Sequence, residues 1–149
     1  MTQKTLKARQ GGFTLIEILI VIGIIAVLAA IVLVAINPVR LFNKADDSQR
    51  WNDVNAILSA VGQEIVEEQG TITGEITTTV QNISSGGADI CAMLVTEHMA
   101  SLPVDPDSGD ALDTCPGTYD TDYTIVRDND GRITVAATGE VDTNISVTR

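Results

Sequence analysis

Residues 13–36 read FTLIEILIVIGIIAVLAAIVLVAI, an apolar block of 24 residues whose only charged residue is Glu17. As an α-helix at about 1.5 Å per residue the block would extend about 36 Å, and the hydrocarbon core of a bilayer is about 30 Å thick. Three basic residues and no acidic residue precede the block: Lys4, Lys7 and Arg9. The positive-inside rule then predicts a single membrane crossing, with the N-terminus in the cytoplasm and the rest of the chain exported.

Two simpler interpretations of the block explain less of the sequence. A secretory signal peptide has an apolar core of about 7–15 residues followed by a cleavage site of small residues, and this block is longer. A plain membrane anchor would not need Glu17, because a charged residue at the bilayer centre costs about 2.5–3.5 kcal/mol on insertion scales, and less near the edge. The carboxylate therefore predicts a cationic partner inside the apolar layer.

Outside the block the chain is acidic and poor in reactive residues. It contains 20 Asp and Glu against 9 Lys and Arg, for a formal net charge of −11, and only 3% of its residues are aromatic. From residue 51 onwards 17 acidic residues stand against 3 basic ones, so this part repels phosphate backbones and no nucleic acid is expected as a ligand. A single His, His98, and two Cys exclude a Cys/His zinc cage within one copy. No nucleotide-binding glycine motif occurs, and no enzyme is expected.

Gly12 followed by Phe13-Thr-Leu-Ile-Glu17 resembles the processing and assembly motif of type IV pilins and of the type II secretion pseudopilins. In that family a prepilin peptidase cuts after the glycine, on the cytoplasmic side, and methylates the new N-terminal residue. The resemblance implies that residues 1–12 are a leader peptide and that Phe13 becomes the methylated N-terminus. Residues 13–36 would then form the transmembrane and filament-core helix.

The same resemblance gives Glu17 a role in assembly. Cleavage would leave a free α-amine on Phe13, which is cationic at neutral pH. In the family this amine meets the Glu carboxylate of a neighbouring subunit, so Glu17 of one copy would offset the charge on Phe13 of another. Removing one partner of a buried ion pair costs about 3–5 kcal/mol. The pair would therefore set the register between subunits.

The helical pattern continues beyond Asn37 and Pro38. Apolar residues recur at helical spacing as far as residue 65, and Gly70 is a suitable stop. We expect residues 37–70 to form an amphipathic continuation of the helix, kinked or opened near Pro38, and residues 71–149 to form an exported acidic head. A simple boundary at Pro38 between the membrane helix and the exported part is the alternative. The apolar positions are Leu41, Phe42, Ala45, Val54, Ile57, Leu58, Val61 and Ile65, and the polar face comprises Asp46, Asp47, Gln49, Asp53, Glu64 and Glu67.

The head has the character of strands and loops, with His98 expected at its surface or at the boundary of its core. In chain order the expected elements are a strand or extended loop over residues 71–80, a linker at 84–87, a short helix within 88–100, a hairpin of 123–127 and 132–137 about a turn at 128–131, and a final extended run at 144–147. A long helix on a small antiparallel sheet is the α+β pilin fold, and this is the fold class that we expect.

Cys91 and Cys115 are separated by 24 positions in the exported part. In an oxidising compartment they would form a disulfide, which is worth about 3–4 kcal/mol in the chain-entropy model. Two reduced cysteines in the core are the alternative interpretation.

Four carboxylates, those of Asp105, Asp107, Asp110 and Asp113, lie within nine residues. Such spacing can wrap a calcium ion with oxygen ligands, and major pseudopilins resemble this chain in carrying a calcium site in a C-terminal loop. The segment lacks the full EF-hand register, so a solvated acidic turn is the alternative. No cofactor is required by this interpretation, and calcium is the one candidate.

The sequence thus predicts a structural subunit of a type IV pilus-like filament. The alternatives are a type II secretion pseudopilin that forms a short periplasmic piston, and a membrane-tethered binding domain that does not polymerise. The expected partners are identical subunits, the prepilin peptidase, and the assembly ATPase with its membrane platform. Before assembly the chain would cross the cell membrane once, and afterwards it would lie in an extracellular filament.

Overall fold

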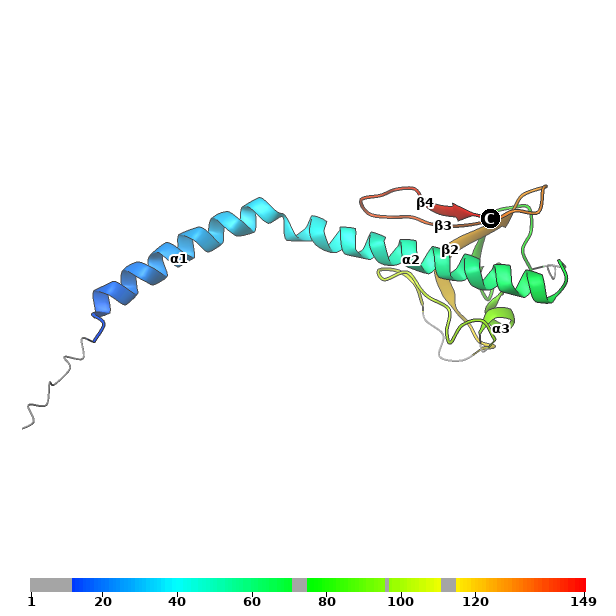
Figure 1. Cartoon of the computed structure of the whole chain (residues 1–149), viewed down its shortest axis with the longest axis horizontal. Helices are drawn as coiled ribbons and strands as arrows, with labels where there is room; N and C mark the ends of the chain where they lie inside the picture. The colour runs from blue at the N-terminus through cyan, green and yellow to red at the C-terminus, as the bar shows by residue number, and fades with distance from the viewer. Residues whose placement is uncertain (1–11, 71–74, 96, 111–114) are drawn as a thin grey trace, which may run out of the picture. The chain divides into compact units, whose positions relative to one another are not determined.

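Figure 1 shows the computed structural model of the chain, which describes residues 12–70, 75–95, 97–110 and 115–149. The chain divides into two compact units, one ending at Pro38 and the other comprising Val39–Arg149. Each unit is described by itself.

The described part of the first unit is essentially one helix, α1 (Leu15–Ile36). None of its 22 residues is buried, and at about 1.5 Å per residue it is about 33 Å long. Within the described part of the chain it is the one helix long and apolar enough to cross a membrane. Asn37 ends the helix in a left-handed conformation with φ 46°, which Asn tolerates better than most residues.

The next helix, α2 (Pro38–Glu67), begins directly after this break. Proline suits the first position of a helix, because the N–H that it lacks would have no partner there and its fixed φ is already helical. The predicted opening near Pro38 is therefore a boundary between two helices. At the other end the N–H of Gly70 donates to the carbonyl of Ile65 over 2.7 Å, and the φ of 88° at Gly70 is accessible to glycine at no steric cost.

The buried face of α2 agrees with the apolar pattern in its second half only. Val54, Ile57 and Val61 are completely buried, whereas Leu41 and Phe42 are exposed. The prediction was also wrong about Asp47, which was assigned to the polar face and is only 4% exposed. Its burial is possible because other parts of the fold supply hydrogen-bond donors to its carboxylate, as described below.

Four antiparallel strands form one sheet in the order β1 (Gln81–Ser84), β2 (Asp120–Arg127), β3 (Ile133–Ala137), β4 (Ile145–Thr148). Each strand pairs with its neighbour in sequence; β2, β3 and β4 are labelled in Figure 1. Alternate residues of a strand point to opposite faces, and the inward set packs with α2 in one core. The buried apolar residues of β2, β3 and β4 are Tyr123, Ile125, Ile133, Val135 and Ile145, and Thr121 of β2 is buried beside them.

This architecture is the α+β, pilin-like fold that we predicted, with a long apolar helix, a second helix and a small antiparallel sheet. The hairpin is β2 and β3 about the predicted turn, and the final strand is β4. Residues 75–80 form no strand, which agrees with the loop alternative for this segment, and the first strand begins at Gln81; residues 71–74 lie outside the described part. The short helix α3 has only four residues, Cys91–Leu94, because Val95 is already extended.

Candidate processing and assembly site

Thr14 and Glu17 form a capping box at the start of α1. The backbone N–H and the hydroxyl of Thr14 both donate to Oε2 of Glu17, each over 2.8 Å. The N–H of Glu17 donates to the Thr14 hydroxyl over 3.3 Å. The carboxylate also lies in the first turn, where the helix dipole favours negative charge. Glu17 therefore has a partner within its own chain, which our sequence analysis missed although Thr-x-x-Glu is the signature of a capping box.

The apolar side chains around this turn point outward. Phe13 is 86% exposed, and Leu15 and Ile18 are exposed as well. A helix that is apolar around its whole circumference requires an apolar environment on all sides, such as lipid or other helices. Gly12 and Phe13 precede the helix and belong to no regular element, so the predicted cleavage point lies in non-helical chain.

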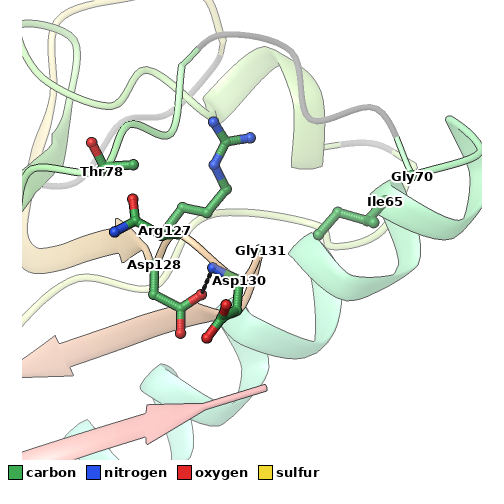
Figure 2. Close-up of a pocket in the computed structure, with 8 residues that line it drawn as sticks. Ile65, Gly70, Thr78, Arg127, Asp128, Asp130 and Gly131 are labelled. Carbon is green, nitrogen blue, oxygen red and sulfur yellow. Dashed lines mark hydrogen bonds between the residues drawn. The ribbon is translucent and has the colours of Figure 1, made fainter.

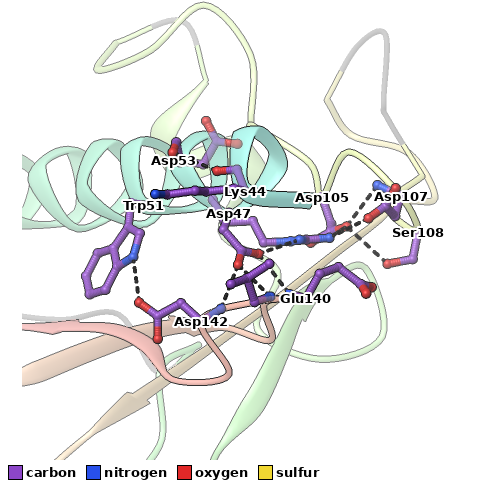
Figure 3. Close-up of polar contacts among 12 residues, drawn as sticks. Lys44, Asp47, Trp51, Asp53, Asp105, Asp107, Ser108, Glu140 and Asp142 are labelled. Carbon is purple, nitrogen blue, oxygen red and sulfur yellow. Dashed lines mark hydrogen bonds and ion pairs between the residues drawn. The ribbon is translucent and has the colours of Figure 1, made fainter. Parts of the chain in front are cut away.

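The second unit contains a group of charges around a buried arginine, the Arg50 cluster, which comprises Asp47, Arg50, Asp105 and the half-exposed Asp107 (Figure 3). The guanidinium of Arg50 donates from Nε and Nη2 to the two oxygens of Asp105, over 2.6 and 2.9 Å. It also donates to Asp47 over 2.9 Å and to Asp107 over 2.8 Å. Arg50 is only 2% exposed. The fork of guanidinium donors thus joins α2 to the loop that contains Asp105.

Asp47 connects the same helix to a second loop. Its carboxylate accepts hydrogen bonds from three successive backbone N–H groups, those of Glu140, Val141 and Asp142, over 2.7–2.8 Å. Gly139 lies next to this carboxylate, and a Cβ at residue 139 would lie 2.7 Å from Oδ1 of Asp47. The Asp47 carboxylate therefore orders the chain between β3 and β4.

These contacts shift the ionisation of the cluster. Burial by itself would raise the pKa of Asp47, but the three backbone donors and Arg50 outweigh it and lower the pKa to about 2. At Asp105 burial would also raise the pKa, but the hydrogen bonds from the guanidinium of Arg50 outweigh it and hold the pKa below its usual value. The hydrogen bond to Asp105 is the main cause that raises the pKa of Arg50. All three groups are thus charged at neutral pH.

The acidic segment that suggested calcium contains part of this cluster. Asp105 is buried and uses both oxygens on Arg50, and Asp107 contacts the same guanidinium. Asp110 is exposed, and its N–H donates to the carbonyl of Asp120 over 2.7 Å; Asp113 lies outside the described residues. The calcium site stays a prediction, and any calcium ion bound there would share Asp105 and Asp107 with Arg50.

The disulfide between Cys91 and Cys115 is present in the structure, with its Cα atoms 5.9 Å apart. The backbone N–H of Cys91 donates to the hydroxyl of Tyr119 over 3.3 Å, and this hydroxyl donates to Asp89 over 2.9 Å. The disulfide thus ties α3 to the segment just before β2.

A shallow pocket lies beside the hairpin turn, between Arg127 and the end of α2 (Figure 2). Asp128 orders the turn by accepting the N–H groups of Asp130 and Arg132, over 3.0 and 2.8 Å. The turn is therefore satisfied by its own residues, in line with our interpretation of Asp128 and Asp130 as turn residues.

His98 was expected at the surface or at the boundary of the core, and the structure confirms a boundary position, because the residue is partly buried. Its side chain is only 3% exposed and its Nε2 lies 2.8 Å from Oε2 of Glu64 on α2. No local pattern indicated this contact, because the two residues are 34 positions apart.

Comparison with known families gives one match. The family model described as the prokaryotic N-terminal methylation motif matches residues 7–33. This model describes a structural motif of pilins and not a family of enzymes. No curated protein and no solved structure gave a match. The resemblance of Gly12, Phe13 and Glu17 to this motif is thus confirmed, and the chain carries the prepilin-type signal that is the hallmark of type IV pilins and pseudopilins.

Proposed function

We propose that this protein is a structural subunit of a type IV pilus-like filament, cleaved between Gly12 and Phe13 and polymerised through α1. One observation carries the proposal: a helix of 22 residues with no buried side chain begins within the methylation motif, just after the proposed cleavage point, and has a carboxylate in its first turn. The apolar surface of α1 suits lipid before assembly and the helices of identical subunits afterwards.

Packing between the α1 helices drives assembly in this proposal, and Glu17 sets their register. Lipid tails are as apolar as the side chains of α1, so association within the membrane depends on close packing and on specific polar contacts. The specific contact is the ion pair between Glu17 of one copy and the α-amine of Phe13 of another. Both hydrogen bonds from Thr14 go to Oε2, so a neighbour's amine can bind Oε1 while the cap persists.

The prepilin peptidase, the assembly ATPase and its membrane platform are the partners that this cycle requires. The chain would begin as a single-pass membrane protein with a cytoplasmic N-terminus and end in a surface filament, with the head on the outside. The strongly acidic composition of the head would keep such a filament soluble and disfavour direct capture of DNA.

Intact mass and N-terminal sequencing of material sheared from the surface of the native host test the proposal. A sheared fibre whose subunits begin at N-methylated Phe13 is the expected result. Processed protein found only in the membrane fraction would replace the filament with a short pseudopilus. A chain that still begins at Met1 would overturn the proposal in favour of a membrane-tethered domain.

A further inference from the structure

The end of α2 and the turn after α3 bring together three side chains of metal-binding type, Glu64, Glu97 and His98. One nitrogen or oxygen atom from each lies within 4.8 Å of the other two. We propose that these residues form a binding site for a divalent transition-metal ion, with Zn²⁺ as the representative ion. The inference is independent of filament assembly, because all three residues belong to the second unit.

The electrostatics of the group favour a bound cation. His98 is 3% exposed and Glu64 is 17% exposed at their side chains, while Glu97 is exposed to solvent. Within the described part of the chain, no Lys or Arg forms an ion pair with either glutamate. Two carboxylates so close together repel each other, and a divalent ion between them would offset both charges.

The donor set selects the class of metal. One imidazole nitrogen with two carboxylate oxygens is typical of zinc and its neighbours, whereas calcium and magnesium prefer oxygen alone. Zn–N and Zn–O bonds of about 2.0–2.2 Å in a tetrahedral site place the ligand atoms about 3.4 Å apart. Nε2 of His98 and Oε2 of Glu64 are now 2.8 Å apart, so a small side-chain rotation would replace the shared proton by the metal. Three protein ligands leave the fourth position to water.

The backbone around His98 is already fixed, which lowers the cost of forming the site. The N–H groups of His98 and Met99 both donate to the carbonyl of Leu94, each over 3.1 Å. Leu94 is completely buried, and α3 is tied down by the disulfide of Cys91. A metal ion would join this turn to α2 and stabilise the folded head by mass action.

Cobalt is the first probe, because tetrahedral Co²⁺ absorbs visible light and Zn²⁺ displaces it. The experiment uses the full-length chain in detergent, without a histidine tag. We expect one equivalent of Co²⁺ to bind with a visible absorption band that Zn²⁺ abolishes. Zn²⁺ should also raise the midpoint of thermal unfolding.

Variants then assign the ligands. Glu64→Gln, Glu97→Gln and His98→Gln should each weaken Zn²⁺ binding at least tenfold. Glu67→Gln is the matched control, since it removes the same charge from α2 one turn further along, outside the group, and it should bind Zn²⁺ like the wild type. Glu97 is exposed, so its variant remains informative if the substitutions of the partly buried Glu64 and His98 prevent folding.

Three results would overturn the proposal. The first is the absence of a Co²⁺ band that Zn²⁺ removes. The second is a Zn²⁺ affinity in Glu97→Gln or His98→Gln equal to that of the wild type. The third is an equal loss in Glu67→Gln and Glu64→Gln, which would indicate weak binding to the acidic surface in general.

Discussion

Arg50 and Asp105 lie 55 positions apart in the sequence and form a bidentate ion pair in the buried part of the head, with contacts of 2.6 and 2.9 Å. Both side chains are almost fully excluded from solvent. The same guanidinium also pairs with Asp47, whose carboxylate binds the loop before β4. One arginine on α2 therefore positions two loops of the head.

Arg50→Met should destabilise the head strongly. The substitution keeps an apolar stem of similar length but leaves Asp47 and Asp105 buried without their cation, which costs about 3–5 kcal/mol for a buried pair. Urea unfolding of the full-length chain in detergent, followed by tryptophan fluorescence from Trp51, measures the loss. Asp107→Asn is the matched control. Its side chain is half exposed, so its contact with Arg50 is worth about 0–1 kcal/mol, and an equal loss in both variants would contradict the assignment.

The stability of the head should fall as the pH is lowered from about 5 towards 2. The pKa of Asp47 drops on folding from an ordinary value of 3.8 to about 2. A carboxyl whose pKa is lower in the folded state stabilises the fold fully above its unfolded pKa, and this contribution is lost as the pH falls through the folded value. Asp105 acts in the same direction. The midpoint of urea unfolding at a series of pH values measures the effect.

The variant Asp47→Asn provides the control for this pH dependence. It should be less stable than the wild type at pH 7 and should lose a smaller share of its stability between pH 5 and pH 2. An acid profile identical to that of the wild type would show that other carboxylates dominate the titration.

Gly139→Ala should destabilise the head although it adds only a methyl group. The new Cβ would come closest to the backbone carbonyl oxygen of Asp142 and would lie 2.7 Å from Oδ1 of Asp47 and 2.9 Å from Cδ1 of Ile145, so the loop must shift and the carboxylate loses its backbone donors. Overpacking of this kind costs about 1–3 kcal/mol. Gly86→Ala is the control, because nothing lies within 4 Å of its added Cβ. Thermal unfolding of the two variants should differ by several degrees, and equal midpoints would refute the prediction.

Two substitutions at Glu17 should separate capping from charge pairing. Glu17→Ala removes both the carboxylate and the cap with Thr14, whereas Glu17→Gln keeps an oxygen that can accept from Thr14. If the ion pair with the amine of Phe13 sets the register, both variants should insert into the membrane and neither should yield normal filament. The measurement compares, for each variant, the yield of sheared fibre with the amount of the protein in the membrane fraction. Normal yield from Glu17→Gln would mean that Glu17 acts as a cap, and normal yield from both would remove it from assembly altogether.

Features that depend on a few neighbouring residues were predictable. The apolar run became α1, the Asp-Asn-Asp-Gly turn became the hairpin of β2 and β3, and the prepilin motif was recognised from Gly12 to Glu17. The hydrogen bonds between Thr14 and Glu17 could also have been predicted, because Thr-x-x-Glu is the local signature of a capping box. We had predicted only a contact between Glu17 and a neighbouring subunit. In each case the interacting groups are close along the chain, so sequence spacing and chemistry suffice.

The charged contacts inside the head could not be predicted in this way. Hydrophobic periodicity placed Asp47 on the polar face of α2, because a periodic pattern carries no information about donors that arrive from 93–95 positions away. The buried pair of Arg50 with Asp105 and the partly buried pair of Glu64 with His98 depend likewise on loops folding back over α2. Sequence alone therefore determined the prepilin signal, the apolar helix and the α+β class, all of which follow from local propensity and patterning. Only the tertiary structure decided which charges are buried, because burying a charge is affordable only where distant parts of the chain meet to pair it.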